Sequence, residues 1–563
     1  MQQLLHEWAK DKPNFLEPLW DTAYLETRIA NPVNTNYFLH HGLPPAGHWA
    51  AQAGVQAQLQ HAAVLAQAAA AFFTSIRDEQ LPAEDDGRGN PVCMSQYPRV
   101  FAHARIAAPG SDLLQNFNKP PSGLPTSHYA TQWMCEEPRH VAVLMGGRVA
   151  TVDILDEGGR PLSSGGILEQ LQAAVTKARA SAIPAAPLGA LTYLDRDTAA
   201  AARAALGASG EAARHLLHTV DSALFVLCLD GVLDVSDSKL DDDTVLKRVM
   251  HGQPTVGNRW FDKHNLIVMP HGVAAWNLEH AQGDATPILK LLDAQVMHRN
   301  AAAPPTAMGG AAAKAALLEA QLDDAALKLL QQGVQAWSDM DSAVKVRALT
   351  VPVGSSDIKA VQCSPDAFVQ QVFQVACMAL HKQPAAAYES VATRGFLHGR
   401  TEVGRSTSSA SVQLARSVNA SPKASPGEKA MLHAAIAAQN AYMKEAKAGH
   451  GVDRHMYALK CMAQMNKVPL PALLGDELAT MSSTWRLSTS NAGTQHTDRF
   501  GYGPVTTGGY GLGYLIHPQE FKVSVASFEG SGFHDAEWPV NTSTFSSAIE
   551  TAAHRLMQTA QWE

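Results

Sequence analysis

The sequence of 563 residues lacks several features that define specialised classes of protein. Its six cysteines are scattered and include no Cys-x-x-Cys pair, so we predict neither a disulfide framework nor a zinc site, and the thiols suit a reducing compartment. No apolar run approaches the ~20 residues that cross a bilayer, so we expect no transmembrane segment. The 44 basic residues are outnumbered by 52 acidic ones, which argues against nucleic acid as a partner.

What is present is the composition of a folded chain. Hydrophobic residues make up 46% of the sequence and charged residues 17%, and the length suffices for two or more domains with their own cores. The first ten residues contain no secretory apolar segment and are too acidic for a typical transit peptide. The last three residues are not a peroxisomal signal, so no compartment is predicted.

Helix-like and strand-like segments are mixed in both halves, which predicts an α/β fold. The alternating segments 140–145 and 148–154, joined by two glycines, predict a β-hairpin. We expect helices over 49–81, 195–206 (ending at Gly207), 317–343, 364–381, 427–448 and 548–558, and strands over 188–192, 223–229, 266–269, 345–353, 487–490, 511–516 and 521–528. The Ala/Pro/Gly-rich residues 301–316 predict a linker or surface loop.

The segment around His280 is the first candidate for chemistry. Asp284 follows four residues later, and the pair lies between a predicted strand and a predicted helix over 287–296. A neutral imidazole is the usual general base near neutral pH, and a nearby carboxylate can orient it directly or through an arginine. In a chain with 24 histidines this spacing alone is weak, so the hypothesis depends on the other motifs.

Two other segments offer hydroxyl groups and glycines. Ser488 and Ser490 fall on one face of a predicted strand, where two hydroxyls can bind a carboxylate and a developing oxyanion. A polar strand face is the commoner explanation of such spacing. The glycine-rich stretch 499–514 matches neither GxGxxG nor the P-loop, so we interpret its glycines as sites of tight bends and close backbone approach.

Two basic residues have alternative interpretations. Lys359 precedes a predicted helix N-terminus, where a lysine can serve a phosphate group or can simply be solvated. Arg400 is either a member of a structural ion-pair network or a clamp for a substrate, because a buried arginine needs a partner.

Short motifs occur along nearly the whole chain: NFLEPLW at 14–20, CMSQY at 93–97, NRWFDK at 258–263, EH at 279–280, SPD at 364–366, YES at 388–390, GRTE at 399–402, DRH at 453–455, STS at 488–490 and GPV at 503–505. In order and spacing these motifs resemble those of the carnitine/choline acyltransferase family. The resemblance implies an α/β (α+β) fold of two similar domains like chloramphenicol acetyltransferase, with an active-site tunnel between them. It places an N-terminal acyltransferase domain at 38–325 and a C-terminal one at 326–563, with the helical residues 1–37 packing on the latter.

The same resemblance implies an activity, the reversible transfer of a short acyl group between CoA and the hydroxyl of L-carnitine. His280 matches the catalytic histidine, which acts as general base in a direct transfer without an acyl-enzyme. Asp284 matches the acidic residue that helps to orient the histidine, and we expect it to pair with Arg400. Ser490 matches the hydroxyl placed near the oxyanion.

The acceptor is predicted from five positions that match the family's carnitine site: Tyr388, Thr401, Arg454, Ser488 and Tyr502. Four of them correspond to groups that hold the carnitine carboxylate, and the fifth, Tyr502, to an aromatic ring beside the trimethylammonium group. A carboxylate held away from water needs charge-assisted donors, which Arg454 supplies. The choline enzymes of the family lack that arginine, so we expect carnitine.

The length of the acyl group is predicted from Phe500. Short-chain members of the family have a bulky residue at this position and longer-chain members have glycine, so Phe500 favours acetyl or propionyl, although the adjacent Gly501 offers some space. The alternatives are a medium-chain carnitine acyltransferase, a choline acyltransferase, or an inactive homologue that binds carnitine or acyl-CoA.

CoA enters as a co-substrate, and the resemblance implies no permanently bound cofactor and no metal. The positions that match the CoA site are Lys359, Asp366, Ser364, Ser390, Asn491 and Ser355. Two of them depart from the family pattern: Ser355 replaces one of two lysines for the 3′-phosphate, and Asn491 replaces a glutamine. The chain also begins later than is usual in the family. We expect a monomer with L-carnitine and acetyl-CoA as its small-molecule partners.

Overall fold

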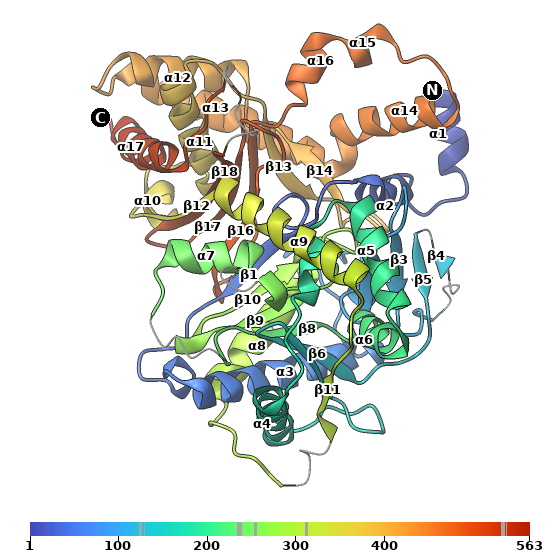
Figure 1. The fold of residues 1–563 in the computed structure, drawn as a ribbon. Helices are drawn as coiled ribbons and strands as arrows, with labels where there is room; N and C mark the ends of the chain where they lie inside the picture. The colour runs from blue at the N-terminus through green and yellow to red at the C-terminus, as the bar shows by residue number, and fades with distance from the viewer. Residues whose placement is uncertain are drawn as a thin grey trace.

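Two large mixed β-sheets, each covered by helices, form the frame of the protein in this computed structural model (Figure 1). The structure describes residues 1–122, 127–128, 130–233, 239–252, 256–309, 314–530, 535 and 538–562. The first sheet has the order β11 (Ala316–Leu318), β7 (Arg148–Asp153), β6 (His140–Met145), β8 (Val226–Leu229), β9 (Asn265–Val268), β10 (Ala274–Leu278), β1 (Tyr37–His41), β16 (Thr497–Tyr502). The second has the order β12 (Val344–Val351), β18 (Phe521–Phe528), β17 (Tyr510–Ile516), β15 (Leu487–Asn491), β13 (Ala387–Ala392), β14 (Thr401–Gly404).

The remaining elements cover these sheets. A small third sheet has the order β2 (His103–Ile106), β3 (Leu113–Asn116), β5 (Thr131–Trp133), β4 (Ser127–His128). The helices are α1 (Gln2–Ala9), α2 (Glu17–Glu26), α3 (Val55–Arg77), α4 (Ser164–Ala180), α5 (Arg196–Ala208), α6 (Glu211–Ser222), α7 (Asp242–His251), α8 (Ala285–Ala301), α9 (Asp324–Ala343), α10 (Ser355–Ala360), α11 (Pro365–His381), α12 (Ser409–Ala420), α13 (Pro426–Glu445), α14 (Asp453–Met465), α15 (Ala472–Gly475), α16 (Glu477–Ser482) and α17 (Thr542–Ala560).

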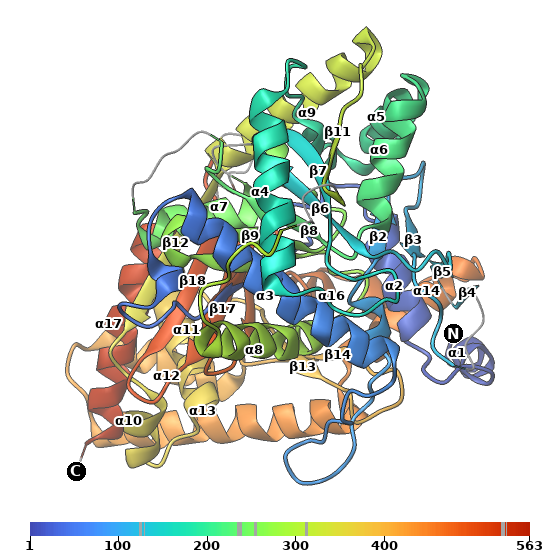
Figure 2. The same cartoon turned by 90° about the horizontal axis from the view of Figure 1, so that it is seen from below.

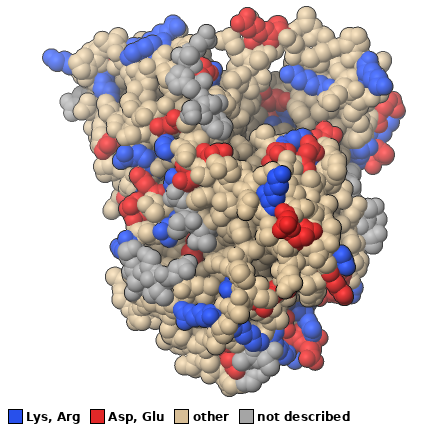
Figure 3. All heavy atoms as spheres, in the orientation of Figure 1, with Lys and Arg blue, Asp and Glu red and all other residues tan. Residues whose placement is uncertain are grey.

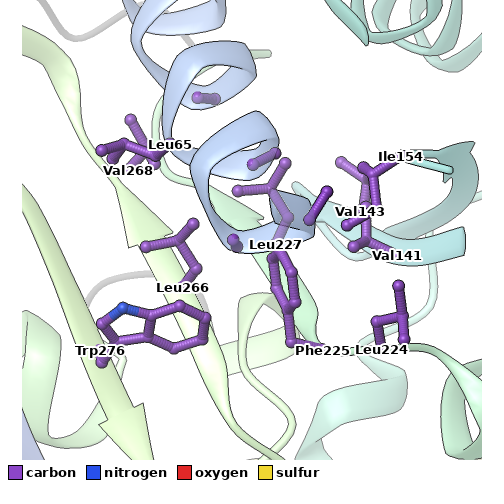
Figure 4. Packing of buried hydrophobic residues seen from close by; sticks show 14 of the residues in the cluster. Leu65, Val141, Val143, Ile154, Leu224, Phe225, Leu227, Leu266, Val268 and Trp276 are labelled. Carbon is purple, nitrogen blue, oxygen red and sulfur yellow. The ribbon is translucent and has the colours of Figure 1, made fainter. Parts of the chain in front are cut away.

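Helix α3 lies on the first sheet between α4 and α8 (Figure 2). Its small residues Ala62, Ala66 and Ala69 are fully buried, and Leu65 lies in the same core as Leu227 of β8 (Figure 4). Small side chains allow the helix to approach the sheet closely, so apolar contacts replace water on both surfaces. The helix is long and apolar enough to cross a membrane, but 67% of its most apolar window is buried in this core, so it is weak support for a span.

One strand of the first sheet comes from the C-terminal half of the chain. β16 pairs antiparallel with β1, with Tyr502 opposite Tyr37 and Phe500 opposite Leu39. Gly513 of β17 lies so close to the backbone of Phe500 that a Cβ atom would overlap it. The interpretation of these glycines as sites of close approach is therefore confirmed, and the two sheets meet at this point.

All other strands of the first sheet precede residue 325, and all strands of the second follow residue 326. The division of the chain into domains at this position stays a prediction, with β16 as a strand that crosses it. The N-terminal helices also reach the C-terminal half, because Leu5 and Leu19 pack in one cluster with Ala458 and Met462 of α14.

The surface on the face seen in Figure 1 is mixed in charge. Lys and Arg side chains lie among Asp and Glu side chains there, and uncharged residues separate them (Figure 3). This pattern agrees with a composition whose net charge is only −8.

Several predicted elements are confirmed. The hairpin is formed by β6 and β7, with Gly146 and Gly147 at φ 56° and 76° in its turn. The helix predicted from residue 364 is α11, with Ser364 at its N-cap position. The strand before His280 and the helix after it are β10 and α8.

Several predicted bounds are wrong: the helix expected over 49–81 is α3 and covers only Val55–Arg77, the strand expected from residue 223 begins at Val226, and the helix expected from residue 548 begins at Thr542. Three further differences have a physical reason. Residues 188–192 belong to the 3-10 helix Leu188–Tyr193, because Pro187 begins a turn whose backbone bonds are local rather than those of a ladder. The helix predicted from residue 317 begins at Asp324, because Ala316–Leu318 pairs with β7 as strand β11. Gly207 does not end α5, which continues to Ala208.

Candidate active site

A cavity of about 360 Å³ lies where the two sheets meet. Its walls come from α2, the start of α8 and strands β13, β14, β15 and β16. Eleven of the residues singled out from the sequence line it: His280, Asp284, Tyr388, Ser390, Thr401, Arg454, Ser488, Ser490, Asn491, Phe500 and Tyr502. The structure thus brings together groups that are more than 200 residues apart in the chain.

His280 follows β10 and is held by its neighbours on three sides. Its Nδ1 lies 3.1 Å from the carbonyl oxygen of Gly283, which can only accept, so this nitrogen carries the proton. The ring stacks on Tyr24 at 5.2 Å and meets the edge of Tyr37 at 4.8 Å. Burial lowers the pKa of His280, and Arg400 lowers it further while Asp284 opposes both. The ring is therefore neutral near pH 7, with Nε2 available as a base.

The predicted ion pair between Asp284 and Arg400 is present. Nε of Arg400 donates to Oδ2 of Asp284 at 3.0 Å, and Nη2 lies 3.3 Å from the carbonyl oxygen of His280. Gln96 holds Asp284 at two points. Its Nε2 donates to Oδ2 of Asp284 at 2.9 Å, and its Oε1 accepts from the backbone N–H of Asp284 at 2.7 Å. Asp284 thus orients His280 indirectly, by fixing the loop whose Gly283 carbonyl binds the ring.

Arg454, at the start of α14, forms the charged wall of the cavity. Its Nη2 donates to the hydroxyls of Tyr388 at 3.0 Å and Thr401 at 3.2 Å, and its Nε donates to the Thr401 carbonyl at 2.9 Å. The indole of Trp20 lies over the guanidinium at 3.8 Å. Within the described part of the chain, Nη1 has no hydrogen-bond partner. The guanidinium is held in place yet keeps donors free for an anion.

Strand β15 presents its serines to the cavity. Ser488 and Ser490 line it, whereas Thr489 points to the opposite side and bonds the carbonyl oxygen of Tyr388 at 2.8 Å. The expectation that both serines share one face is confirmed. β15 lies in parallel register between β13 and β17, so the sheet fixes the direction in which both serine side chains point.

Phe500 closes the side of the cavity next to β1. It is only 4% exposed, and its ring lies 6.3 Å from that of Tyr37 and 5.6 Å from that of Tyr502. The adjacent Gly501 does not open a space there, because a Cβ atom at that position would meet the ring of Phe38 at 2.6 Å. The absence of a side chain at Gly501 makes room for Phe38 rather than for a ligand.

The six residues matched to a CoA site fall into two groups. Ser390 and Asn491 line the cavity, and Asn491 donates from Nδ2 to Oδ1 of Asp366 at 3.1 Å, which places Asp366 at its border. The others lie outside the lining: Ser364 at the start of α11, and Lys359 and Ser355 on α10. Lys359 is exposed on α10 and does not line the cavity that holds His280 and Asp284.

The side chains at the site that had no role assigned from the sequence include Trp20, Tyr24, Tyr37 and Gln96. Trp20 and Gln96 lie inside motifs that carried the family resemblance, at 14–20 and 93–97, so the motifs marked them as relevant. Tyr24 and Tyr37 had no such signal, because aromatic residues at these spacings usually belong to a core.

A larger hollow of about 600 Å³ lies elsewhere, beside the C-terminal end of α3. Four of its charged side chains form two ion pairs, Lys119 with Glu137 at 2.6 Å and Arg77 with Asp78 at 2.7 Å. Size alone does not make it the active site, because the smaller cavity holds the free imidazole nitrogen and the free guanidinium nitrogen.

Comparison with known proteins agrees with this assembly. The profile of the family described as Choline/Carnitine o-acyltransferase matches residues 1–550. The chain is 29% identical to a putative mitochondrial carnitine O-acetyltransferase of Saccharomyces cerevisiae, over 92% of this chain and 81% of the relative. It is 29% identical to peroxisomal carnitine O-octanoyltransferase of Bos taurus (95% and 86% covered) and 30% identical to mitochondrial carnitine O-palmitoyltransferase 2 of Mus musculus (93% and 81% covered). The chain belongs to the choline/carnitine O-acyltransferase family.

Proposed function

We propose that the protein transfers an acetyl or propionyl group reversibly between CoA and the hydroxyl of L-carnitine. The observation that carries this proposal is the presence, in one cavity, of a neutral imidazole with a free Nε2 and an arginine with a free Nη1. The first suits the removal of a proton from an alcohol, and the second suits a carboxylate on the same acceptor.

In the proposed mechanism, Nε2 of His280 removes the proton as the acceptor hydroxyl oxygen attacks the thioester carbonyl carbon. The C=O π electrons move to oxygen and give a tetrahedral oxyanion, toward which the hydroxyl of Ser490 can donate. When the C=O bond re-forms, the C–S bond breaks and the CoA sulfur leaves with the proton held by the imidazolium. No covalent acyl-enzyme is formed in this sequence, and the histidine ends neutral, as it began.

Two features support carnitine over choline as the acceptor. Choline has no carboxylate and carries a net positive charge, so it would leave Nη1 of Arg454 buried beside a cation without a partner. The hydroxyls of Tyr388 and Thr401 already bind Nη2, and they fix the guanidinium plane for a planar anion. The rings of Tyr502, Tyr388 and Trp485 at the same cavity offer π faces to a trimethylammonium group.

Two features support a short acyl group. Phe500 fills the side of the cavity beside Tyr37, and Gly501 leaves no free volume because Phe38 occupies it. The named relatives do not decide the question, because acetyl, octanoyl and palmitoyl transferases match at 29–30% identity. The proposal of acetyl or propionyl therefore depends on the side chain at position 500.

For the CoA side we propose the border formed by Ser390, Asn491 and Asp366, with Ser364 at the neighbouring helix start. Lys359 would meet the 3′-phosphate from α10, where Ser355 supplies no second charge. The short helix and its exposed lysine suit a flexible contact with a phosphate in water, which is weaker than a buried one.

The direct test is thiol release from acetyl-CoA with L-carnitine or choline as acceptor, repeated with octanoyl-CoA as donor. We expect rapid release with acetyl-CoA and carnitine only. Release with choline would overturn the argument from Arg454, and equal release from octanoyl-CoA would overturn the argument from Phe500. Stabilisation of the fold by L-carnitine without any thiol release would identify a binding protein instead.

A further inference from the structure

A buried carboxylate outside the cavity lies behind the groups that hold His280. Asp21 belongs to α2, and its side chain is fully buried. Its Oδ1 accepts from Nη1 of Arg400 at 2.8 Å, and its Oδ2 accepts from Nη1 of Arg99 at 3.4 Å. A carboxylate so far from water requires such donors. The two arginines therefore fix the position of the Asp21 carboxylate, and the carboxylate in turn fixes theirs.

Arg400 connects Asp21 to the loop that carries the base. Its Nε bonds Asp284 at 3.0 Å, and Nη2 and Nη1 lie 3.3 Å from the carbonyl oxygens of His280 and Ala281. The guanidinium is planar and rigid. Loss of the bond from Nη1 to Asp21 would therefore turn the whole group and move Nε, which bonds Asp284 of the loop.

We propose that Asp21 is a positioning residue for acyl transfer, which fixes Arg400 and thereby the loop that aims Nε2 of His280 at the acceptor. The inference rests on the proposed role of His280 as general base. The helix α2 is well suited to this role, because Trp20 and Tyr24 lie one turn apart on it and contact Arg454 and His280 respectively. One helix therefore touches both the acceptor clamp and the base.

Asp21 also influences the charge around the base. Arg400 lies between Asp21 and Asp284, and its positive charge lowers the pKa of His280 whereas Asp284 raises it. If Asp21 becomes neutral, its negative charge no longer offsets part of the positive charge of Arg400, so the pKa of His280 falls further. The acid limb of the pH profile for kcat/KM, where the base becomes protonated, then moves to lower pH.

The shift of the acid limb should be smaller for a carboxylate that lies one ion pair farther from Arg400. Glu17, one turn before Asp21 on α2, binds Nη2 of Arg99 at 2.9 Å and the ring of His398 at 2.7 Å. Its hydrogen bonds connect it to Arg400 through Arg99 and Asp21, so its charge acts on Arg400 from farther away than that of Asp21 does. Neutralising Glu17 should therefore change the pH profile in the same direction as neutralising Asp21, but by less.

The test compares Asp21→Asn, Glu17→Gln and a matched control, Asp230→Asn. Asp230 is a buried carboxylate that binds Arg259 at 2.7 Å through both oxygens, away from the cavity. For Asp21→Asn we expect kcat to fall by roughly 10- to 100-fold, with KM for L-carnitine within about threefold, because the geometry of the base and not the acceptor clamp is disturbed. We expect the acid limb to move down by roughly 0.5 to 1 pH unit. Asp230→Asn should lower Tm and leave the limb in place.

Wild-type kcat and an unmoved acid limb in folded Asp21→Asn would overturn the inference. If Asp21→Asn does not fold, Glu17→Gln replaces it, and an unmoved limb in that variant overturns the inference in the same way. If the wild-type protein transfers no acyl group, the proposed function fails. The positioning claim is then still tested by the pH-dependent rate at which diethyl pyrocarbonate modifies His280, mapped by mass spectrometry, which must differ between the wild type and Asp21→Asn.

Discussion

The proposed base and the proposed acceptor clamp of this cavity are built in opposite ways. On the side of His280, the groups that hold the ring are already bound to one another: the Gly283 carbonyl oxygen binds the ring, Gln96 binds the side chain and the backbone N–H of Asp284, and Arg400 bonds Asp284 and the His280 carbonyl oxygen. On the side of Arg454, the guanidinium is braced through Nε and Nη2 but keeps Nη1 free, and Ser488 and Ser490 point into the cavity.

The difference between the bound groups around His280 and the free donors of Arg454 follows from the proposed role of each residue. A base must lie within a fraction of an ångström of its proton, so its support should be rigid and complete before the substrate arrives. A binding group gains its energy from bonds that form only with the ligand, so its donors must be left open. The comparison predicts that damage on the first side lowers kcat, whereas damage on the second side raises KM.

The largest effect on the His280 side is expected from His280→Ala. Loss of a general base lowers the rate by roughly 10²- to 10⁴-fold, so we expect kcat for acetyl-CoA and L-carnitine to fall by about a thousandfold. Carnitine binding, measured by calorimetry, should stay close to that of the wild type because Arg454 is untouched. A variant that keeps most of its activity would contradict the assignment of the base.

The opposite side is tested by Arg454→Ala. Hydrogen bonds to a charged partner contribute about 1.5–3 kcal/mol each, so we expect KM for L-carnitine to rise by roughly 10- to 100-fold with a much smaller change in kcat. The KM for acetyl-CoA serves as the internal control, because Arg454 belongs to the proposed acceptor side of the cavity and that constant should stay close to the wild-type value. An unchanged KM for carnitine would remove the argument for a carboxylate clamp.

The local part of this site could be predicted from the sequence and the long-range part could not. Ser488 and Ser490 alternate on one strand, so their spacing places both on one face, and His280 and Asp284 lie four residues apart in the short loop between β10 and α8, so the chain itself keeps them close. The pairing of Asp284 with Arg400, 116 residues away, was predicted only through the family resemblance.

The supporting residues show why the rest was missed. Asp21 and Gln96 meet Arg400 and Asp284 across 379 and 188 residues of chain, and no local pattern indicates such contacts. The same holds for β16, which leaves its own half to join the first sheet beside β1. Short apolar runs are also ambiguous in themselves, as the 3-10 helix Leu188–Tyr193 shows.

A third test asks whether Phe500, in the wall of the cavity, limits the length of the acyl group. Phe500→Gly removes a buried ring that neither holds the base nor binds the acceptor, so we expect the ratio of kcat/KM for octanoyl-CoA to that for acetyl-CoA to rise at least about tenfold. The loss of a buried aromatic side chain costs about 3–5 kcal/mol of stability, so Tm should be measured alongside. An unchanged ratio in the folded variant would show that another residue limits the acyl group.

The smallest expected effect lies farthest from both sides, on α10. Ser355→Lys adds a second positive charge one turn before Lys359, where both side chains can reach the same phosphate. Exposed charge pairs contribute about 0.2–1 kcal/mol, so we expect KM for acetyl-CoA to fall by only about threefold, and the gain to fade at high salt. Ser356→Lys is the matched control, because it adds the same charge at the next residue, on a different face of the helix. An equal gain in both variants, or an equal gain with dephospho-CoA, would mean that net charge rather than contact with the 3′-phosphate is responsible, and Lys359 would then lose its proposed role.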